Sequence, residues 1–281
     1  MKRILVPTDL SEPSRIELDY ALVFADTFGA DLTLFYADPM HFEFDLMTGA
    51  PIYVAGVTAE DRARLEKDVR AWADRSLQHR PYRVVIGAGD PVASIVRQSR
   101  DEASDLIVMA THGLSGWRRT AIGSVTEGVV HEAKCPVLSV TRTRGKRREL
   151  TPGVTKIVCP TNFSPVAEEA LKTARELAKM FGCELVVVHV VEQPSAQPPA
   201  DYREIVLRGG AAERVLDYID DIKGDLLVIG AQHQLFKDAT VIGTTTERLI
   251  RFSRVPVLTI VRPAAVVETP PERVSTVTMA R

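Results

Sequence analysis

The chain contains the stretch Ile4-Leu5-Val6-Pro7-Thr8-Asp9-Leu10-Ser11 and, 153 positions later, the similar stretch Ile157-Val158-Cys159-Pro160-Thr161-Asn162-Phe163-Ser164. The same offset relates Phe28-Gly29 to Phe181-Gly182, so the intervening segment is repeated without a gap. Self-similarity at a fixed offset is typical of a duplicated structural unit. The sequence therefore predicts two related domains in its 281 residues.

The second copy is shorter than the first. From Tyr82 over Tyr202 onward the offset between the copies is 120, which is 33 residues less than before and corresponds to about one helix and a loop. We place the domains at residues 1–143 and 154–263, separated by a basic linker. Residues 264–281 lack any periodicity, and we expect them to form a disordered tail.

Short apolar runs alternate with segments of helical periodicity in both copies. In the first copy the apolar runs are residues 4–6, 32–37, 82–86, 106–109 and 137–140. Short apolar strands separated by helices are typical of a parallel sheet that is covered on both faces. Because such crossovers are right-handed, we expect the α/β class, with each copy a doubly wound, Rossmann-like parallel sheet.

One helix of the first copy has no counterpart in the second. Residues 58–78 predict an amphipathic helix with Leu65, Val69 and Trp72 on one face, whereas the second copy has a proline-rich segment after Val191. One face of the second sheet then needs another cover. Residues 40–56 show no regular pattern, and we expect a long loop that acts as a lid or an interface segment.

Composition places the chain among globular proteins and names no polymeric partner. The hydrophobic share is 45%, the charged share is 26%, and the formal net charge is -2. This charge gives no long-range attraction for nucleic acid or an anionic membrane. No apolar run approaches the ~20 residues that span a bilayer, and the start is too short for a signal h-region. We expect a cytoplasmic protein.

Two unusual segments follow strands that neighbour each other in a doubly wound sheet. The first is Pro7-Thr8-Asp9; the second is Met109-Ala110-Thr111-His112-Gly113, followed nine residues later by Gly123-Ser124-Val125-Thr126 at a helix start. Ligands of open parallel sheets bind at the carboxyl ends of strands where the winding reverses. Glycines allow close backbone approach, and free amides at a helix start favour anionic oxygens. This combination indicates a polyphosphate site.

The same residues also have purely structural interpretations. Ser124–Glu127 and Thr244–Glu247 each match a capping box, which helps a helix to begin whether or not a ligand binds. Asp9 is a common turn residue, and Gly113 a common loop breaker. The residues alone leave both interpretations open.

The spacing Ala110-x2-Gly113-x9-Gly123-Ser124 resembles the nucleotide loop Gly-x2-Gly-x9-Gly-(Ser/Thr) of the universal stress protein family. Three further features resemble the family and occur in the same order. They are a first strand that ends in a Pro-x-Asp turn, the sequence Gly89-Asp90-Pro91, and the last strand within 135–140. The resemblance covers residues 1–142 and, with the deletion, 155–262. It implies two tandem domains of the adenine nucleotide alpha hydrolase-like fold.

ATP-binding members of that family imply a role for each matching residue of the first copy. The resemblance assigns the ribose and adenine to Pro7, Thr8, Asp9 and Ala37, one wall of the site to Met109, Ala110, His112 and Gly113, and the phosphates to Gly123, Ser124, Val125 and Thr126. It implies Mg²⁺ carried by the phosphates rather than by protein carboxylates, and we assign no metal ligand and no catalytic residue. Ala110 departs from the motif, because its methyl group replaces the first glycine.

The second copy departs further from the family pattern. Asn162 replaces Asp9, His233 replaces Gly113 and Thr244 replaces Ser124, although Gly230 restores the first glycine. A bulky imidazole where the backbone faces phosphate disfavours a triphosphate, so we expect no nucleotide there. Last strands of two domains associate in this family. We therefore expect strand 137–140 to pair with strand 257–260 within the chain, and the chain to form a homodimer.

Three functions remain at this point. The first is a stress-response protein that binds ATP in its N-terminal domain and acts as a regulatory or protective binding protein on unidentified partners. The second is a slow ATPase or nucleotidyl-transfer enzyme, for which Arg118 and Arg119 could stabilise phosphate charge. The sequence shows no Walker motif and no nucleophile with an evident base, which argues against this alternative. The third is a scaffold without nucleotide that acts through its dimer surface.

Overall fold

The computed structural model describes residues 1–12, 14–38, 42–44, 51–53, 58–77, 80–111, 123–141, 154–192, 205–231, 233–236 and 239–261. The linker and the C-terminal tail that the sequence predicts lie outside these residues. So do His112, Gly113, Arg118 and Arg119.

Each copy forms a five-stranded parallel sheet, as the alternation predicts. The strands of the first half lie in the order β5 (Tyr82–Ala88), β2 (Asp31–Asp38), β1 (Arg3–Thr8), β6 (Leu106–Ala110), β7 (Val137–Val140). Those of the second half lie in the order β10 (Ile205–Arg208), β9 (Glu184–Val191), β8 (Lys156–Thr161), β11 (Leu226–Ala231), β14 (Val257–Val261). The order is the same in both halves and reverses direction beside the first strand, so the doubly wound α/β class is confirmed.

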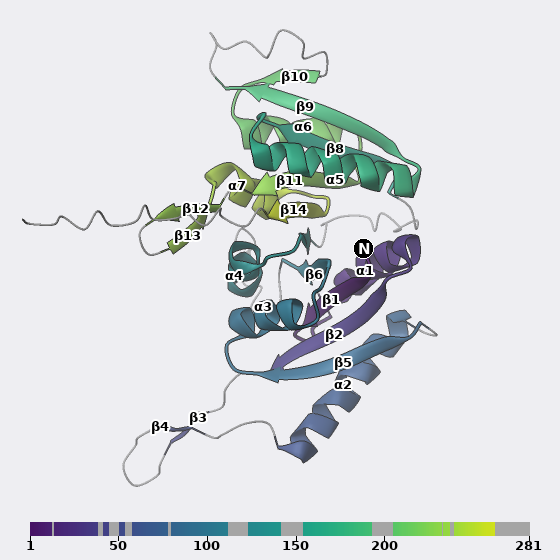
Figure 1. The fold of residues 1–281 in the computed structure, drawn as a ribbon, viewed down its shortest axis with the longest axis vertical. Coiled ribbons are helices and arrows are strands. Elements are labelled where there is room, and N and C mark those ends of the chain that lie inside the picture. Colours follow the sequence, from purple (N-terminus) through teal and green to yellow (C-terminus); the bar gives the residue numbers. More distant parts are fainter. Residues whose placement is uncertain are drawn as a thin grey trace, which may run out of the picture.

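The two half-sheets join into one ten-stranded sheet. Strand β7 pairs with β14 in antiparallel fashion, with Leu138 opposite Leu258 and Ser139 opposite Val257. Figure 1 shows the second half stacked above the first along the long axis of the molecule. The predicted pairing of the last strands within one chain is confirmed.

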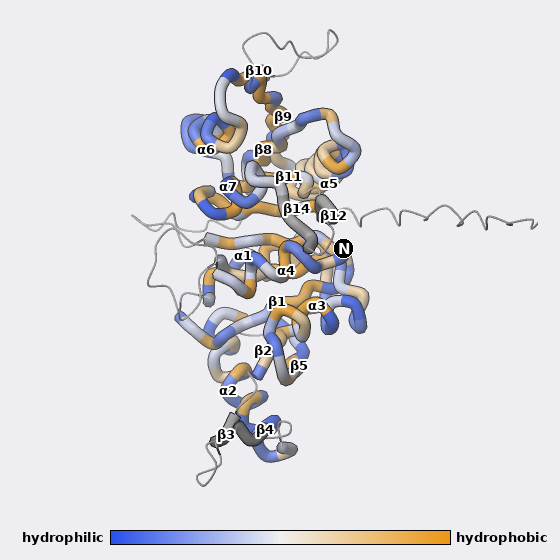
Figure 2. Tube along the Cα trace, turned by 90° about the vertical axis from the view of Figure 1, so that its left-hand side faces the viewer, coloured by the Kyte–Doolittle hydropathy of each residue, from blue (hydrophilic) through white to orange (hydrophobic). Residues whose placement is uncertain are grey.

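Helices cover both faces of this sheet. One face carries α1 (Arg15–Phe28), α2 (Ala59–Leu77) and α5 (Pro165–Phe181). The other face carries α3 (Pro91–Asp101), α4 (Ser124–Glu132), α6 (Ala211–Asp221) and α7 (Thr244–Phe252). Figure 2 shows hydrophobic residues following the central strands between these layers. Phe181 packs edge-on against Phe24 and Phe28, so α5 and α1 contact each other across the junction of the halves.

The predicted helix 58–78 is confirmed as α2, which buries Val69 and Trp72 against the first half of the sheet. No described helix occupies the corresponding place in the second half. There Val206 on β10 lies beside His189 on β9, and 36% of its surface is exposed. The deletion therefore leaves part of the α5 face without a helical cover among the described residues.

Two short antiparallel hairpins lie outside the main sheet. One pairs β3 (Phe42–Phe44) with β4 (Pro51–Tyr53), so the expectation of a loop over 40–56 was wrong for these two stretches. The other residues of 40–56 lie outside the described residues, and the role as a lid or interface segment stays a prediction. The backbone pairing of these two triplets forms an antiparallel ladder that the irregular side-chain pattern did not reveal. The other hairpin pairs β12 (His233–Phe236) with β13 (Ala239–Ile242), and β13 lies against α4 of the first half.

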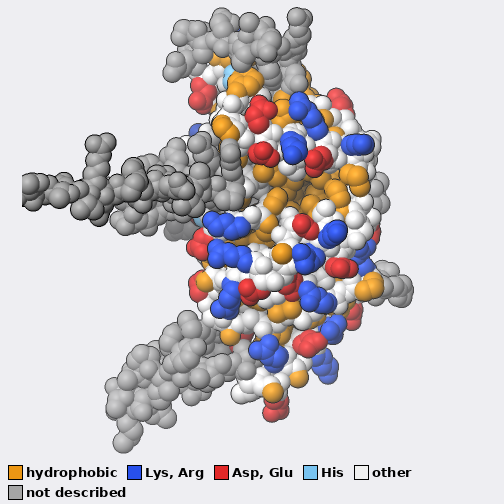
Figure 3. Space-filling view, viewed as in Figure 1, with side chains coloured by type: hydrophobic (Ala, Val, Ile, Leu, Met, Phe, Trp, Pro, Cys, Tyr) orange, Lys and Arg blue, Asp and Glu red, His pale blue; other side chains and the backbone are white. Residues whose placement is uncertain are grey.

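The described surface mixes charges of both signs. Figure 3 shows Lys and Arg side chains interspersed with Asp and Glu over the face in view, in keeping with the net charge of -2. Among the described helices, none combines the length and the apolar character that crossing a bilayer requires.

Candidate functional site

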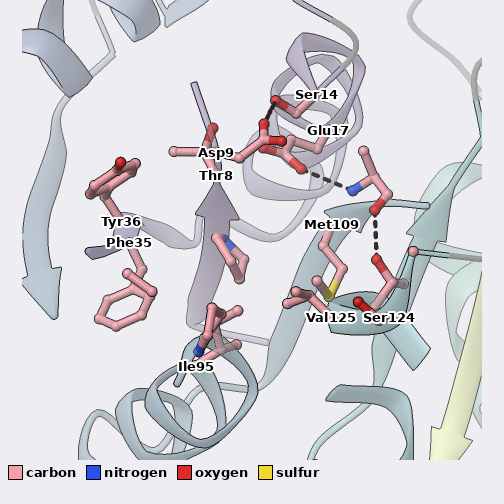
Figure 4. A pocket seen from close by; sticks show the side chains of 16 residues that line it. Thr8, Asp9, Ser14, Glu17, Phe35, Tyr36, Ile95, Met109, Ser124 and Val125 are labelled. Carbon is pink, nitrogen blue, oxygen red and sulfur yellow. Dashed lines mark hydrogen bonds between the residues drawn. The ribbon is translucent and has the colours of Figure 1, made fainter. Parts of the chain in front are cut away.

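A pocket of about 360 Å³ opens at the carboxyl ends of β1 and β6. These two strands are neighbours, with β2 on the other side of β1 and β7 on the other side of β6. The pocket therefore lies where the winding of the first half-sheet reverses, which is the usual ligand position in an open parallel sheet. Figure 4 shows the side chains that line it.

The turn after β1 holds Asp9 in place. Leu10 has a positive φ of 61°, and its N–H donates to Thr8 Oγ1 at 3.0 Å. Asp9 Oδ1 accepts hydrogen bonds from Ser11 N at 3.0 Å and from Ser14 Oγ at 2.8 Å. Asp9 is thus a turn residue, as the structural interpretation held, and it also lines the pocket.

The end of β6 is tied to the start of α4. Thr126 Oγ1 donates to Ala110 O at 2.7 Å, and Gly123 N donates to Thr111 O at 2.7 Å. A Cβ atom on Gly123 would lie 3.0 Å from Thr111 O, so this position favours glycine. The close contact brings the first turn of α4 to the edge of the pocket.

The capping-box interpretation of this helix start was wrong. Gly123 is the N-cap of α4, no side chain caps the helix, and Ser124 is already the first helical residue. Gly243 is likewise the N-cap of α7, so Thr244 does not cap that helix. Amides in the first turn of a helix have no intrahelical acceptor and carry the positive end of the helix dipole. In α4 these amides lie at the pocket that Ser124, Val125 and Thr126 line.

An apolar wall faces the polar end of the pocket. It is formed by Phe35 and Ala37 on β2, Ile95 on α3, Met109 on β6 and Val125 on α4. A Cβ atom on Gly87 would lie 2.5 Å from the ring of Phe35, so the glycine of β5 makes room for that ring. These apolar side chains form a slot, and such a slot suits a flat, weakly polar group.

Glu17 also lines the pocket, although it lies in the apolar stripe of α1. Only 1% of its surface is exposed, and its Oε2 accepts a hydrogen bond from Ala110 N at 2.9 Å. Burial raises the pKa of this carboxyl well above its ordinary value, and the charge of Asp9 adds to that shift. Hydrogen bonds from the Ala110 amide and the Thr8 side chain oppose it. Burial, with the charges of Asp38, Asp9 and Asp68, also raises the pKa of Tyr36.

The structure brings together ten of the twelve predicted site residues, all of them in the lining of this pocket: Pro7, Thr8, Asp9, Ala37, Met109, Ala110, Gly123, Ser124, Val125 and Thr126. His112 and Gly113 lie outside the described residues. The prediction missed six lining residues: Ser14, Glu17, Phe35, Tyr36, Pro91 and Ile95. A signal for Glu17 was present, because an acid interrupts an apolar stripe where the second copy has Ala170.

The corresponding place in the second half is built differently. Asn162 Oδ1 accepts from Ser164 N at 3.1 Å, and Phe163 repeats the positive φ of 61°. A Cβ atom on Gly230 would lie 2.6 Å from Val166 O. The first turn of α5 therefore packs directly on the backbone of β11.

The described residues of the chain contain no group of three or more His, Cys, Asp or Glu side chains that could hold a metal ion. A cation at the described part of the pocket would need most of its ligands from a bound molecule.

Comparison with known proteins gives the same picture as the fold. The model of the universal stress protein family matches residues 1–141, 153–206 and 195–261. Two universal stress proteins of Methanocaldococcus jannaschii resemble this chain. MJ0577 is 29% identical over 158 residues, which cover 50% of this chain and 95% of that protein. MJ0531 is 31% identical over 144 residues, which cover 50% of this chain and 81% of that protein.

A solved structure resembles nearly the whole chain. The crystal structure of a universal stress protein from Archaeoglobus fulgidus aligns with a TM-score of 0.71 and 23% identity, over 93% of this chain and 97% of that one. At that identity the likeness supports the fold alone. The doubly wound fold and the family match, repeated along the sequence, define a tandem α/β protein. The chain belongs to the universal stress protein family.

Proposed function

We propose that this protein is a stress-response protein that binds ATP in its first half and uses the bound nucleotide to regulate a partner or a protein surface. The observation that supports the proposal most strongly is the pocket between β1 and β6. It combines an apolar slot, a fixed carboxylate on Asp9 and the uncapped first turn of α4.

The parts of ATP match the parts of the pocket. The volume of about 360 Å³ lies within the range of small-molecule sites. The adenine suits the slot between Phe35, Ala37 and Met109, and the ribose hydroxyls suit the carboxylate of Asp9. The phosphates suit the free amides of the first turn of α4, where the helix dipole favours negative charge. Mg²⁺ would be carried by the phosphates.

A matched pair of glycine variants tests this arrangement. Gly123→Val places a branched side chain where even a Cβ atom would lie 3.0 Å from Thr111 O, next to the proposed phosphates. Gly243→Val changes the corresponding N-cap of α7, where a Cβ atom would meet nothing within 4 Å. We expect Gly123→Val to lower ATP affinity about 100-fold and Gly243→Val to leave it unchanged within about twofold.

The measurement is calorimetric titration with ATP, together with the nucleotide released on denaturing the purified protein. About one ATP per chain supports the proposal, and unchanged affinity in Gly123→Val contradicts our placement of the phosphates. ADP that accumulates with steady turnover would favour the enzyme. If neither retained nor added nucleotide is detected, the scaffold is favoured.

The domain division, the oligomeric state and the location concern the whole molecule. We propose domains at 1–143 and 154–263, with nucleotide in the first alone. The closed contact between α5 and β11 supports that asymmetry. The homodimer and the cytoplasmic location stay predictions, which light scattering and cell fractionation can test.

A further inference from the structure

Glu17 places a buried carboxyl group in the wall of the pocket. It projects from the first turn of α1 into the pocket beside Asp9, as Figure 4 shows. One oxygen, Oε2, accepts the amide hydrogen of Ala110 at 2.9 Å. The other, Oε1, is buried and has no hydrogen-bond partner among the described residues.

The chemistry of this group follows from its surroundings. Burial and the nearby charge of Asp9 favour the neutral carboxylic acid. The Thr8 side chain is another polar group that acts on this carboxyl, and its hydrogen bond favours the ionised form. Because Oε2 accepts from Ala110, the acid proton belongs on Oε1, which has no hydrogen-bond partner among the described residues. A buried donor of this kind is rare in folded proteins and indicates a missing partner.

The fold itself does not require this carboxyl group. At the corresponding place in the second half, Ala170 is fully buried and Gly230 takes the place of Ala110. There the first turn of α5 packs against the backbone of β11 without any side chain between them. The carboxyl group thus occurs only in the half that has the described pocket.

We propose that Glu17 is a ligand-contacting residue, whose neutral carboxyl group donates a hydrogen bond from Oε1 to an acceptor atom of the bound nucleotide. This inference rests on the proposed nucleotide site and adds a recognition contact to it. A small movement of the side chain toward the pocket is needed, since Oε1 is buried in the absence of ligand.

The proposed contact makes nucleotide binding dependent on pH. As the pH rises through the pKa of Glu17, the side chain loses its donor and adds a negative charge beside Asp9. Among the described lining residues, the other titratable groups are Asp9, whose charge acts on Glu17, and Tyr36 on β2. The lining residues of β6, α3 and α4 carry no charge. With one proton involved, ATP affinity falls by at most tenfold per pH unit.

The test is titration of the full chain with ATP and with adenosine from pH 5 to pH 9. Adenosine separates the Glu17 contact from the titration of the ligand phosphates. Glu17→Gln keeps a neutral donor of the same shape, and Glu17→Ala copies the second half. Glu12→Gln is the matched control, because it removes one negative charge from an exposed side chain near the start of the same helix.

For wild type and Glu12→Gln we expect affinities for both ligands that fall at high pH. Glu17→Gln should bind as wild type does at pH 5 and lack that fall for adenosine, while Glu17→Ala should bind about tenfold more weakly at pH 5. Thermal unfolding checks that each variant folds.

Two results would overturn the inference separately from the proposed function. If wild type binds ATP but Glu17→Gln shows the same pH dependence for adenosine, Glu17 is not the titrating contact. If Glu17→Ala and wild type bind equally at pH 5, Oε1 does not meet the ligand. Failure of the wild type to bind any adenine nucleotide would remove the nucleotide site itself.

Discussion

The turns that follow β1 and β8 have the same backbone conformation but differ in side-chain chemistry. Leu10 and Phe163 have the same positive φ of 61°, and in each turn a threonine hydroxyl accepts the amide of that residue. Asp9 and Asn162 both accept an amide two residues ahead, yet only Asp9 carries a charge. The comparison teaches that duplication preserved the geometry of the turn and left the side chains free to differ.

The neighbouring strands differ by a paired exchange. The first half has Glu17 and Ala110, joined by a hydrogen bond, where the second half has Ala170 and Gly230. Removing both the acid and the methyl group lets helix α5 lie on the backbone of β11. At this place the first half therefore has a carboxyl-lined pocket, and the second half has a closed contact between helix and strand.

The largest difference between the halves is α2, and Trp72→Ala tests how far the first half depends on it. Trp72 is 7% exposed, and its Nε1 donates to Ser11 O at 3.3 Å, behind the site turn. We expect a loss of about 3–5 kcal/mol in the free energy of unfolding, as for other buried aromatic truncations. Hydrogen exchange should show lost protection in β2 and β5.

The second half supplies the internal reference for that prediction, because it has no described counterpart of α2. Protection of β9 should therefore stay as in wild type. Arg64→Ala on the same helix is the control, since its side chain is 71% exposed and its removal should change stability by less than about 0.5 kcal/mol. A loss below about 1 kcal/mol for Trp72→Ala would contradict a supporting role for α2.

A smaller effect is expected where the paired exchange is broken. Gly230→Ala places a methyl group 2.6 Å from Val166 O, a backbone atom that cannot move independently of α5. We expect a loss of about 1–3 kcal/mol by overpacking. The converse variant, Ala110→Gly, should cost about 1 kcal/mol or less. Urea denaturation measures both, and equal effects would show that the two helix–strand contacts are not different.

The buried acid also predicts a pH-dependent stability that needs no ligand. The folded-state pKa of Glu17 lies above its ordinary value of 4.5, so its contribution is fully present below that pH and is lost as pH rises to the folded-state pKa. Over that window, wild type should lose about 1.4 kcal/mol per pH unit relative to Glu17→Gln. Parallel stability curves from urea denaturation between pH 4 and pH 8 would show that Glu17 ionises normally.

The doubly wound class and the position of the pocket could be predicted from sequence because both depend on local signals. Apolar runs, glycine positions and a repeated turn are visible in residues such as Pro7 and Gly123. The sequence shows that Glu17 interrupts an apolar helical stripe, but it does not show what a buried acid contacts, so this signal alone could not place Glu17 in the site. The residues left the cap of α4 open, because Ser124 fits a cap and the first helical turn equally well by residue type; the structure places it in the first turn.

The smallest predicted effect concerns the one residue by which the two turns differ in charge. Asp9→Asn gives the first half the residue of the second, and Asn162 shows that an amide oxygen can still accept the turn amide. Stability should therefore change by less than about 0.5 kcal/mol. Loss of a charged acceptor for the ribose hydroxyls should weaken adenosine binding by up to about tenfold.

Adenosine is the informative ligand for Asp9→Asn, because removing a negative charge also lessens repulsion of the ATP phosphates and partly offsets the loss. The reciprocal variant, Asn162→Asp, restores the acid in the second half but leaves Gly230 beneath α5, and it should gain no adenosine binding. Unchanged adenosine affinity in Asp9→Asn would mean that Asp9 serves the turn alone. A gain of binding in Asn162→Asp would mean that charge, rather than the space between helix and strand, separates the two halves.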